Sequence, residues 1–391
     1  MSRLRPGNVL QLLVCGVQYF PALEQAIDEA EKEIFLETYI FADDETGERI
    51  ASALARAAAR GVRVRVLVDG FGGREFEHTH QPVLDEAGVH TLIFRPEVAR
   101  LSMRRNRLRR MHRKLCVVDG RIGFVGGINI IDDMHTPGQT PPRFDYAVRV
   151  CGPLVTNMHI ECQKLWERVA WATLQFRPRL QPLDRYRNKR IGDVRAALLV
   201  RDNLRHRHDI EDAYMDAIAS ATRDITIANA YFLPGRRFRQ ALIHAAARGV
   251  KVTLILQGRV EYALLHYASQ ALYGSLLSRG VRIFEYRRSF LHAKAAVIDD
   301  DWATVGSSNI DPFSLMLARE ANIVVRDAGF TGELRQSLEA AATHGGRELR
   351  HRQWQHRPLH ERLMRWLAYG MVRIMIGIAG ERLSRHMQRR R

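Results

Sequence analysis

One short pattern occurs twice in the 391-residue sequence: a histidine, a lysine two positions later and an aspartate five positions after that lysine. The copies lie 180 residues apart, and in each an asparagine follows the histidine by 17 positions. The residues are His112, Lys114, Asp119 and Asn129 in the first copy and His292, Lys294, Asp299 and Asn309 in the second. Because lysine occupies only six positions in the whole chain, two copies in the same register are a rare event by chance.

These residue types suit the chemistry of a phosphodiester. Histidine and lysine two positions apart on a strand share a face, which puts an imidazole beside a fixed cation. One histidine can attack phosphorus to form a phosphohistidine while the other protonates the leaving oxygen, and lysine and asparagine side chains can stabilise the non-bridging oxygens. This scheme uses no metal and no cofactor. Each motif aspartate comes at a strand end before a turn, so we expect Asp119 and Asp299 to serve that turn.

Further segments add a family resemblance. They are residues 36–41, 109–114, 124–129, 229–235 and 306–312. Together with the duplicated motif they make the chain, from about residue 8 to 327, resemble the phospholipase D superfamily. More narrowly, it is similar to the short bacterial cardiolipin synthases that lack N-terminal transmembrane helices. The resemblance implies an α/β fold of two duplicated phospholipase D-like lobes, each a mixed β-sheet flanked by helices, packed about a pseudo-twofold axis with one shared active site.

The resemblance also implies a role for each site residue. The six His-Lys-Asp residues form the catalytic set, with His112 as the nucleophile, and Gly127, Asn129, Ser307 and Asn309 bind substrate. An acidic residue downstream of each motif orients the histidine, and Asp145 and Glu320 stand at those places. The chain departs from the family pattern at Ala318, where an asparagine is expected.

The implied activity is transfer of a phosphatidyl group from one phospholipid to the hydroxyl of phosphatidylglycerol. A phosphodiesterase or nuclease that uses water as the acceptor is the alternative, because the same motifs and positive charge would serve a nucleic-acid backbone. Around both motifs arginine alternates with leucine and methionine instead of stacking aromatics, which favours lipid over nucleic acid. A binding protein without catalysis is disfavoured because both histidines and both lysines are present.

The elements that must position these residues repeat as well. Residues 57–62 recur as residues 245–250, each time between a helical pattern and an apolar run, and residues 33–41 correspond to 224–232. Helices alternating with strands predict α/β layering. We expect a first lobe at 1–176, a basic linker at 177–207, a second lobe at 208–345 and a tail at 346–391.

Charge and composition restrict the class of protein further. The formal net charge is +17, from 60 Lys and Arg against 43 Asp and Glu, and favours anionic partners. The four cysteines show no C-x-x-C spacing, and we expect free thiols in a reducing compartment. A secretory signal is disfavoured, and no histidine cluster has the spacing of a zinc site.

Two segments are candidates for contact with a bilayer. Residues 363–380 are apolar, but Arg365 and Arg373 interrupt them, and three arginines close the chain. This composition suits the interface of an anionic membrane better than a spanning helix, with packing against the protein as the alternative. Residues 100–110 alternate arginine with apolar side chains. We therefore expect a peripheral protein on the cytoplasmic side of the inner membrane, with phosphatidylglycerol and cardiolipin as partner lipids and no nucleic acid.

Overall fold

The computed structural model describes residues 4–96, 109–136, 140–174, 189–202, 206–311 and 318–388, with side chains to residue 375. Most of the basic segment at 100–110, part of the linker at 177–207 and the three closing arginines lie outside the described residues.

The chain folds as two halves with the same order of elements. The first half contains β1 (Arg5–Val14), α1 (Cys15–Asp28), β2 (Glu33–Thr38), α2 (Glu45–Ala59), β3 (Arg63–Asp69), α3 (His80–Glu86), β4 (His90–Phe94), β5 (Arg110–Met111), β6 (Lys114–Val118), β7 (Ile122–Gly126), β8 (Tyr146–Cys151) and α5 (Pro153–Ala172). The second contains β9 (Val194–Arg201), α6 (Asp209–Ser220), β10 (Asp224–Asn229), α7 (Arg236–Ala247), β11 (Lys251–Gln257), α8 (Ala263–Leu277), β12 (Arg282–Tyr286), β13 (Lys294–Ile298), β14 (Trp302–Gly306), β15 (Ala318–Arg326) and α10 (Ala328–Gly345). β16 (Gly346–Glu348), α11 (His351–Gln355) and α12 (Leu359–Gln388) follow.

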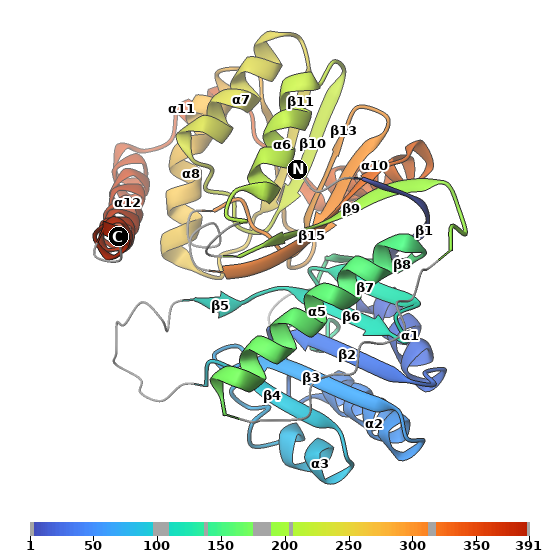
Figure 1. Cartoon of the computed structure of the whole chain (residues 1–391). Helices are drawn as coiled ribbons and strands as arrows, with labels where there is room; N and C mark the ends of the chain where they lie inside the picture. Colours follow the sequence, from blue (N-terminus) through green and yellow to red (C-terminus); the bar gives the residue numbers. More distant parts are fainter. Residues whose placement is uncertain are drawn as a thin grey trace.

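One mixed sheet runs through both halves (Figure 1). Its order is β16-β12-β11-β10-β13-β14-β15-β9-β1-β8-β7-β6-β2-β3-β4. The two halves join at the centre of the sheet, where β1 and β9 pair antiparallel. From this pair outward, and apart from β16, equivalent strands of the two halves follow one another in the same order. The duplicated lobes and the pseudo-twofold relation expected from the sequence are therefore confirmed.

Helices cover both faces of this sheet. α1 and α2 bury one face of the first half through side chains such as Leu23, Ile27 and Leu54, and α6, α7 and α8 do the same in the second half. A larger core joins α5 and α10 to the other faces of both halves. Strands buried on both faces read as continuous apolar runs, which is why the segments before and after each Arg-Gly turn were recognisable in the sequence.

The boundaries of the lobes differ in two places from the expected ones. Residues 194–201, expected within the linker, form β9, which pairs with both β15 and β1 at the centre of the sheet. Arginines at 195 and 201 flank its short apolar run and conceal it among the basic residues around it. The tail also begins inside the second lobe, because β16 pairs antiparallel with β12.

α12 lies at the edge of the second half and packs against α8 (Figure 1). Ala368 and Val372 of α12 form a small core with Leu233, Ala268 and Leu272. Within the part of the chain that is described, no helix combines the length and apolar character needed to cross a bilayer.

Candidate active site

Backbone pairing between the halves brings the two motif histidines to one place. β5, immediately before His112, runs parallel to the start of β15, and the His112 amide donates to the Arg319 carbonyl at 2.9 Å. The second half repeats the arrangement: Leu291 bridges to Phe144 in parallel, and the His292 amide donates to the Phe144 carbonyl at 2.8 Å. Each histidine is thus fixed beside the strand end of the opposite half.

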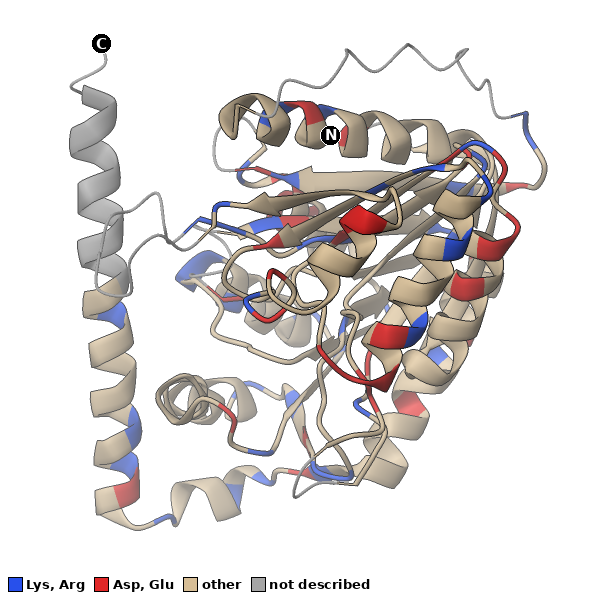
Figure 2. Cartoon of the chain, turned by 90° about the horizontal axis from the view of Figure 1, so that it is seen from below, with Lys and Arg blue, Asp and Glu red and all other residues tan. Residues whose placement is uncertain are grey.

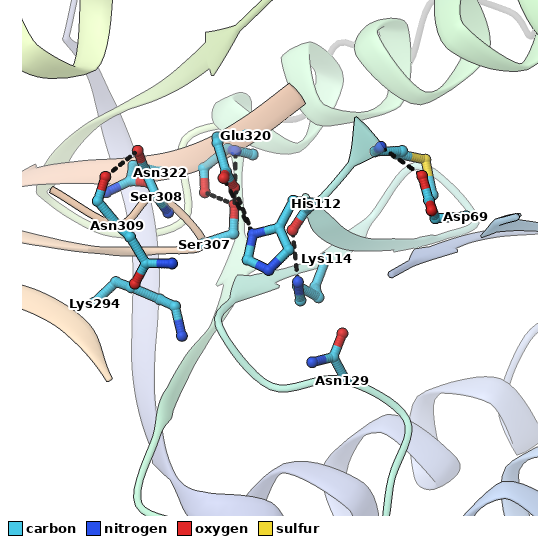
Figure 3. A network of polar contacts seen from close by, with 12 residues as sticks. Asp69, His112, Lys114, Asn129, Lys294, Ser307, Ser308, Asn309, Glu320 and Asn322 are labelled. Atoms are coloured by element: carbon cyan, nitrogen blue, oxygen red, sulfur yellow. Dashed lines mark hydrogen bonds and ion pairs between the residues drawn. The ribbon is translucent and has the colours of Figure 1, made fainter. Parts of the chain in front are cut away.

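The acidic partners are exchanged between the halves as a result. Nδ1 of His112 lies 3.1 and 3.0 Å from the two carboxylate oxygens of Glu320, and Nδ1 of His292 lies 2.6 Å from Oδ2 of Asp145. Figure 3 shows His112 between Glu320 and Lys114. The sequence identified both acids, but it associated each with the motif upstream of it. The pairing is crossed because Asp145 directly follows Phe144, and Glu320 directly follows Arg319, on the strands to which the opposite histidines are bonded.

The two acids occupy equivalent positions but have different supports. Gly126 pairs with Ala147 on β8, and Gly306 pairs with Asn322 on β15, which makes Asp145 and Glu320 equivalent. A Cβ atom on Gly127 would lie 2.4 Å from Oδ1 of Asp145, so only glycine leaves room for that carboxylate. At the corresponding position, the Ser307 hydroxyl donates to Oε2 of Glu320 at 2.5 Å. Gly127 and Ser307, expected to bind substrate, contact the acids in this structure.

Both motif lysines are buried, and each closes a ring with its own histidine. The Nζ atom of Lys114 donates to the His112 carbonyl at 2.6 Å, and Lys294 donates likewise to the His292 carbonyl. Burial lowers the pKa of Lys114 to about 7 and that of Lys294 to about 8, although nearby carboxylates oppose this shift. Two cations held in a poorly solvated site are under electrostatic stress that an anionic substrate would relieve.

The protonation tendencies of the two histidine–acid pairs differ. Burial lowers the pKa of His112, while Glu320 opposes the shift. Burial also lowers the pKa of His292, and there Lys294 and Arg143 add to the shift, placing it well below the ordinary value. Burial raises the pKa of Glu320, but His112, Lys114 and Ser307 outweigh that effect and the net pKa is lowered. Burial raises the pKa of Asp145 to about 6.

Asp145 and Lys294 both lie within hydrogen-bond distance of Nδ1 of His292, and this arrangement indicates which ring nitrogen carries the hydrogen. Nδ1 of His292 lies 2.6 Å from Asp145 and 2.8 Å from Nζ of Lys294. If this nitrogen carries a hydrogen it donates to the carboxylate, and Lys294 then uses the His292 carbonyl and the carboxylate, 3.8 Å away. This arrangement satisfies every charge, so we assign the Nδ1–H tautomer, which leaves Nε2 for the substrate.

The motif asparagines flank the histidines with incompletely used amides. Oδ1 of Asn129 accepts from the Ile40 amide at 3.1 Å. Oδ1 of Asn309 is buried and has no hydrogen-bond partner among the described residues. Figure 3 shows Asn129 beside Lys114 and Asn309 in the group around Lys294. Amides in these places can contact phosphodiester oxygens or an acceptor hydroxyl.

The motif aspartates lie at the opposite ends of their strands from the histidines. Asp119, in the left-handed region with φ of 51°, accepts from the amides of Glu31, Lys32 and Glu33. Asp299, with φ of 48°, accepts in the same way from residues 222–224. The structure therefore gives both aspartates the turn role expected from their positions and does not bring them to the reacting groups.

Two supporting pairs of residues were missed in the sequence. Oδ2 of Asp69, at the end of β3, accepts from the Met111 amide at 2.8 Å, and Gln257, at the end of β11, donates to the Leu291 carbonyl at 3.3 Å. Both hold the residue that precedes a motif histidine. The available signal was a polar residue at the carboxyl end of the equivalent parallel strand in each half.

The other pair anchors the residue between His112 and Lys114. Arg113 is buried and donates through Nη2 to Glu37 at 2.8 Å and to the Glu161 carbonyl at 3.0 Å. Because alternate side chains on a strand point to opposite faces, this ion pair fixes the direction of the histidine and lysine. The ring of Tyr39 packs edge-on to His112, with centroids 4.9 Å apart.

The resulting arrangement offers two imidazoles, two buried ammonium groups and amides around one point. No group of three or more His, Cys, Asp or Glu side chains suited to a metal ion occurs in the described ranges. The site can provide a nitrogen nucleophile, a proton donor and positive charge for non-bridging oxygens from side chains alone.

Comparisons with known proteins match both halves of the chain. A family model described as "Cardiolipin synthase, PLD-like domain" matches residues 23–136 and 214–341, one match in each half. Cardiolipin synthase B of Escherichia coli is 42% identical over 335 residues, which cover 85% of this chain and 80% of the relative. Cardiolipin synthase A of Pseudomonas putida is 32% identical over 85% of this chain and 68% of its own length.

Solved structures share the fold at low sequence identity. Phosphatidylserine synthase of Haemophilus influenzae aligns with a TM-score of 0.67 at 14% identity, over 98% of this chain and 96% of its own. The duplicated motif, the shared site and the match to relatives over most of their length lead to one conclusion. The chain belongs to the cardiolipin synthase family of phosphatidyltransferases, within the phospholipase D superfamily.

Proposed function

We propose that this chain transfers a phosphatidyl group from one phospholipid to the hydroxyl of phosphatidylglycerol and so forms cardiolipin, through a phosphohistidine on His112. The observation that carries the proposal is the crossed histidine–acid pairing, because it leaves Nε2 of both histidines to act on one phosphodiester between two buried lysines. The relatives named cardiolipin synthase support the choice of lipid substrates.

The reaction proceeds in two balanced steps. Nε2 of His112 attacks phosphorus, the P–N bond forms as the bond to the headgroup oxygen breaks, and Nε2–H of His292 gives its proton to that oxygen. In the second step His292 removes the proton from the acceptor hydroxyl, whose oxygen attacks phosphorus and breaks the P–N bond. Glu320 stabilises the positive charge that His112 gains on bonding to phosphorus.

Substrate binding supplies the correct protonation state. Lys294 and Arg143 lower the pKa of His292 in addition to burial, so the free enzyme holds this histidine neutral. The negative charge of a bound phosphodiester offsets the same cations and raises the pKa of His292, so the histidine acquires a proton as the substrate enters. Burial lowers the pKa of His112 and so favours its neutral form, while Glu320 accepts the Nδ1–H and leaves Nε2 free to attack.

A bilayer is the source of both lipids, and α12 is the element suited to contact it. Its buried side is formed by Arg365, Ala368 and Val372, while its outer side presents large apolar side chains. They are Leu359, Leu363, Trp366, Leu367, Met371 and Ile374, each more than half exposed. Exposed apolar residues at this density mark a contact surface. We assign it to the cytoplasmic face of the inner membrane, a location supported by four unpaired cysteine thiols.

The decisive experiment is product analysis with phosphatidylglycerol as sole lipid. Labelled phosphatidylglycerol in vesicles should yield cardiolipin and free glycerol in equal amounts. Phosphatidic acid as the main product would identify water as the acceptor and replace the transferase with a phosphodiesterase. His112→Ala and His292→Ala should each abolish turnover, because the nucleophile and the acid act on the same bond, and an active single variant would contradict the shared site.

A further inference from the structure

A large groove lies apart from the histidine site, where α12 and α11 meet α7 and α8. Its volume is about 740 Å³, and none of the residues placed in the active site above lines it. The α8 residues on its wall include Gln270, Leu272 and Ser275, whereas Leu265, Ser269 and Tyr273 of the same helix line a different cavity. The groove is therefore a separate feature of the second half.

The lining of the groove is basic and contains no carboxylate. Arg239, Arg279, Arg362 and Arg365 contribute to it. Arg365 is buried, and Glu361 already pairs with it at 2.7 Å. The other three have no ion pair with any described residue. These three guanidinium groups come from α7, from the turn after α8 and from α12, and around one groove they suit a phosphate group, which arginine binds through paired hydrogen bonds.

Aromatic and apolar surface adjoins these cations. The indole of Trp354 has the Arg357 and Arg365 guanidinium groups over its ring at 4.5 and 4.9 Å. Trp366 lines the groove and is also 56% exposed. Helical spacing places Arg362, Trp366 and Tyr369 on the side of α12 that faces the groove, next to the outer apolar face. Figure 2 shows α12 along one side of the molecule with basic residues on its described part. The cationic groove is therefore continuous with apolar surface.

We propose that this groove binds the phosphate of a second anionic phospholipid, one that is not being transferred, with its acyl chains along the outer face of α12. The inference rests on the proposed function only in that the bilayer supplying the substrate also supplies this lipid. A lipid bound there would hold the second half against the membrane while the histidine site releases its product.

A second copy of the chain fits the surface less well than a lipid. A symmetric dimer through the outer face of α12 would bring each set of three unpaired arginines close to the identical set of its partner, since such an interface repeats the same patch on both sides. Like charges so placed repel. The anionic lipid instead complements both the charge of the groove and the apolar character of the face.

The test compares two triple variants with equal changes in charge. Arg239→Gln, Arg279→Gln and Arg362→Gln neutralise the groove. Exposed arginines on β1, α5 and β9, none of which lines the groove, provide the control variant, which combines Arg5→Gln, Arg168→Gln and Arg195→Gln. Both sets are introduced into His292→Ala protein so that lipid is bound without being consumed. Circular dichroism should show the same melting transition in both.

Vesicles of phosphatidylcholine mixed with phosphatidylglycerol give the first readout. The groove variant should partition into them about a hundredfold more weakly, since each arginine at an anionic surface contributes about a factor of five. The control variant should lose less than about threefold, because salt screens distant charges. Equal losses in both variants would overturn the proposal.

Stoichiometry gives the second readout. Calorimetry with short-chain phosphatidylglycerol, kept below its micelle concentration, should count two lipids per chain in His292→Ala protein and one in the groove variant. Ser275→Glu, which adds a carboxylate to the exposed wall of α8, should also remove the second lipid. An unchanged count in both variants would refute a groove site.

Two further experiments test whether free phosphate or a second copy of the chain occupies the groove. A third distinguishes failure of the groove proposal from failure of the proposed function. If inorganic phosphate displaces the second lipid at equal concentration, the groove recognises free phosphate and the lipid assignment fails. If sedimentation shows a dimer that Leu363→Ser dissociates, the outer face is a protein interface and the assignment also fails. Cardiolipin formation by the unsubstituted chain is measured separately: its absence, with two lipids bound, refutes the proposed function and leaves the groove site intact.

Discussion

Glu320→Gln is expected to block the first chemical step, although Glu320 lies 208 residues from the nucleophile in sequence. Glutamine keeps the size of the side chain and can still accept from Nδ1–H of His112, so the change removes mainly the negative charge. That charge lies 3.0 Å from a ring that becomes positive when Nε2 bonds to phosphorus. Loss of the charged partner of a catalytic imidazole costs about 10³- to 10⁴-fold in kcat, or about 4 to 5.5 kcal/mol in the barrier.

Substrates with different leaving groups distinguish loss of the charge beside His112 from loss of the proton donor, His292. Asp145→Asn weakens His292, which protonates the leaving oxygen, so it should slow transfer from phosphatidylglycerol by a similar factor. A phosphatidyl ester of 4-nitrophenol needs no proton donor, because nitrophenolate departs as the anion. Asp145→Asn should release the first nitrophenolate at nearly the normal rate, whereas Glu320→Gln should be slow with both esters.

The assay is a rapid-quench measurement of the first turnover, followed by mapping of the labelled peptide. The label in Asp145→Asn protein should lie on His112. Glu31→Gln, an exposed acid whose ion-pair partner among the described residues is Arg121 at 3.9 Å, is the control and should behave as the unsubstituted chain. The reverse pattern, with Asp145→Asn slow on both esters and label on His292, would exchange the two roles. Equal impairment by both substitutions on both esters would refute the division of labour.

Three other outcomes are expected. Burial lowers the pKa of Lys294 from 10.5 to about 8. Below pH 8 this shift reduces the free energy of unfolding by about 3 kcal/mol, and the reduction disappears as the pH approaches 10.5. Lys294→Met should therefore abolish transfer but raise Tm more near pH 7 than near pH 10. Activity should survive exhaustive chelation by EDTA, and loss restored by zinc or magnesium would contradict charge stabilisation by side chains. Leu363→Ser with Leu367→Ser should weaken vesicle binding at unchanged Tm, measured by co-sedimentation and calorimetry, whereas unchanged binding would remove α12 from the interface.

These two leucine substitutions test α12 better than removal of all residues after His356 would. From sequence alone, removal of the tail would be expected to leave the lobes folded. In the structure α12 also covers Leu233, Ala268 and Leu272, so truncation would expose core side chains together with removing the outer face. Substitutions on the outer face change membrane contact without this second effect.

The sequence predicted the duplicated fold, and it identified the histidines, lysines and acids that the structure brings together. His-x-Lys on a strand, apolar runs and the repeated Arg-Gly turn are formed by residues close together in the sequence. Such patterns can be recognised without a structure. The exchange of Asp145 and Glu320 was hidden, because it depends on which strand ends meet across the pseudo-twofold axis. Strand β9 was not predicted for another reason. Its arginines resemble those of the basic linker around it, and its central place in the sheet depends on pairing with β1 and β15.

The exchanged acids also bear on how such a chain could arise. Since each half supplies the partner that the other half's histidine needs, two separate copies of one ancestral lobe, related by a twofold axis, would already assemble two identical half-sites into a working centre. Joining them in one polypeptide makes that assembly independent of concentration and lets the copies diverge. Gly127 beside a short aspartate and Ser307 beside a longer glutamate are such a divergence. In two equal subunits the paired histidines have the same acidity until a substrate binds, whereas a fused pair can differ beforehand.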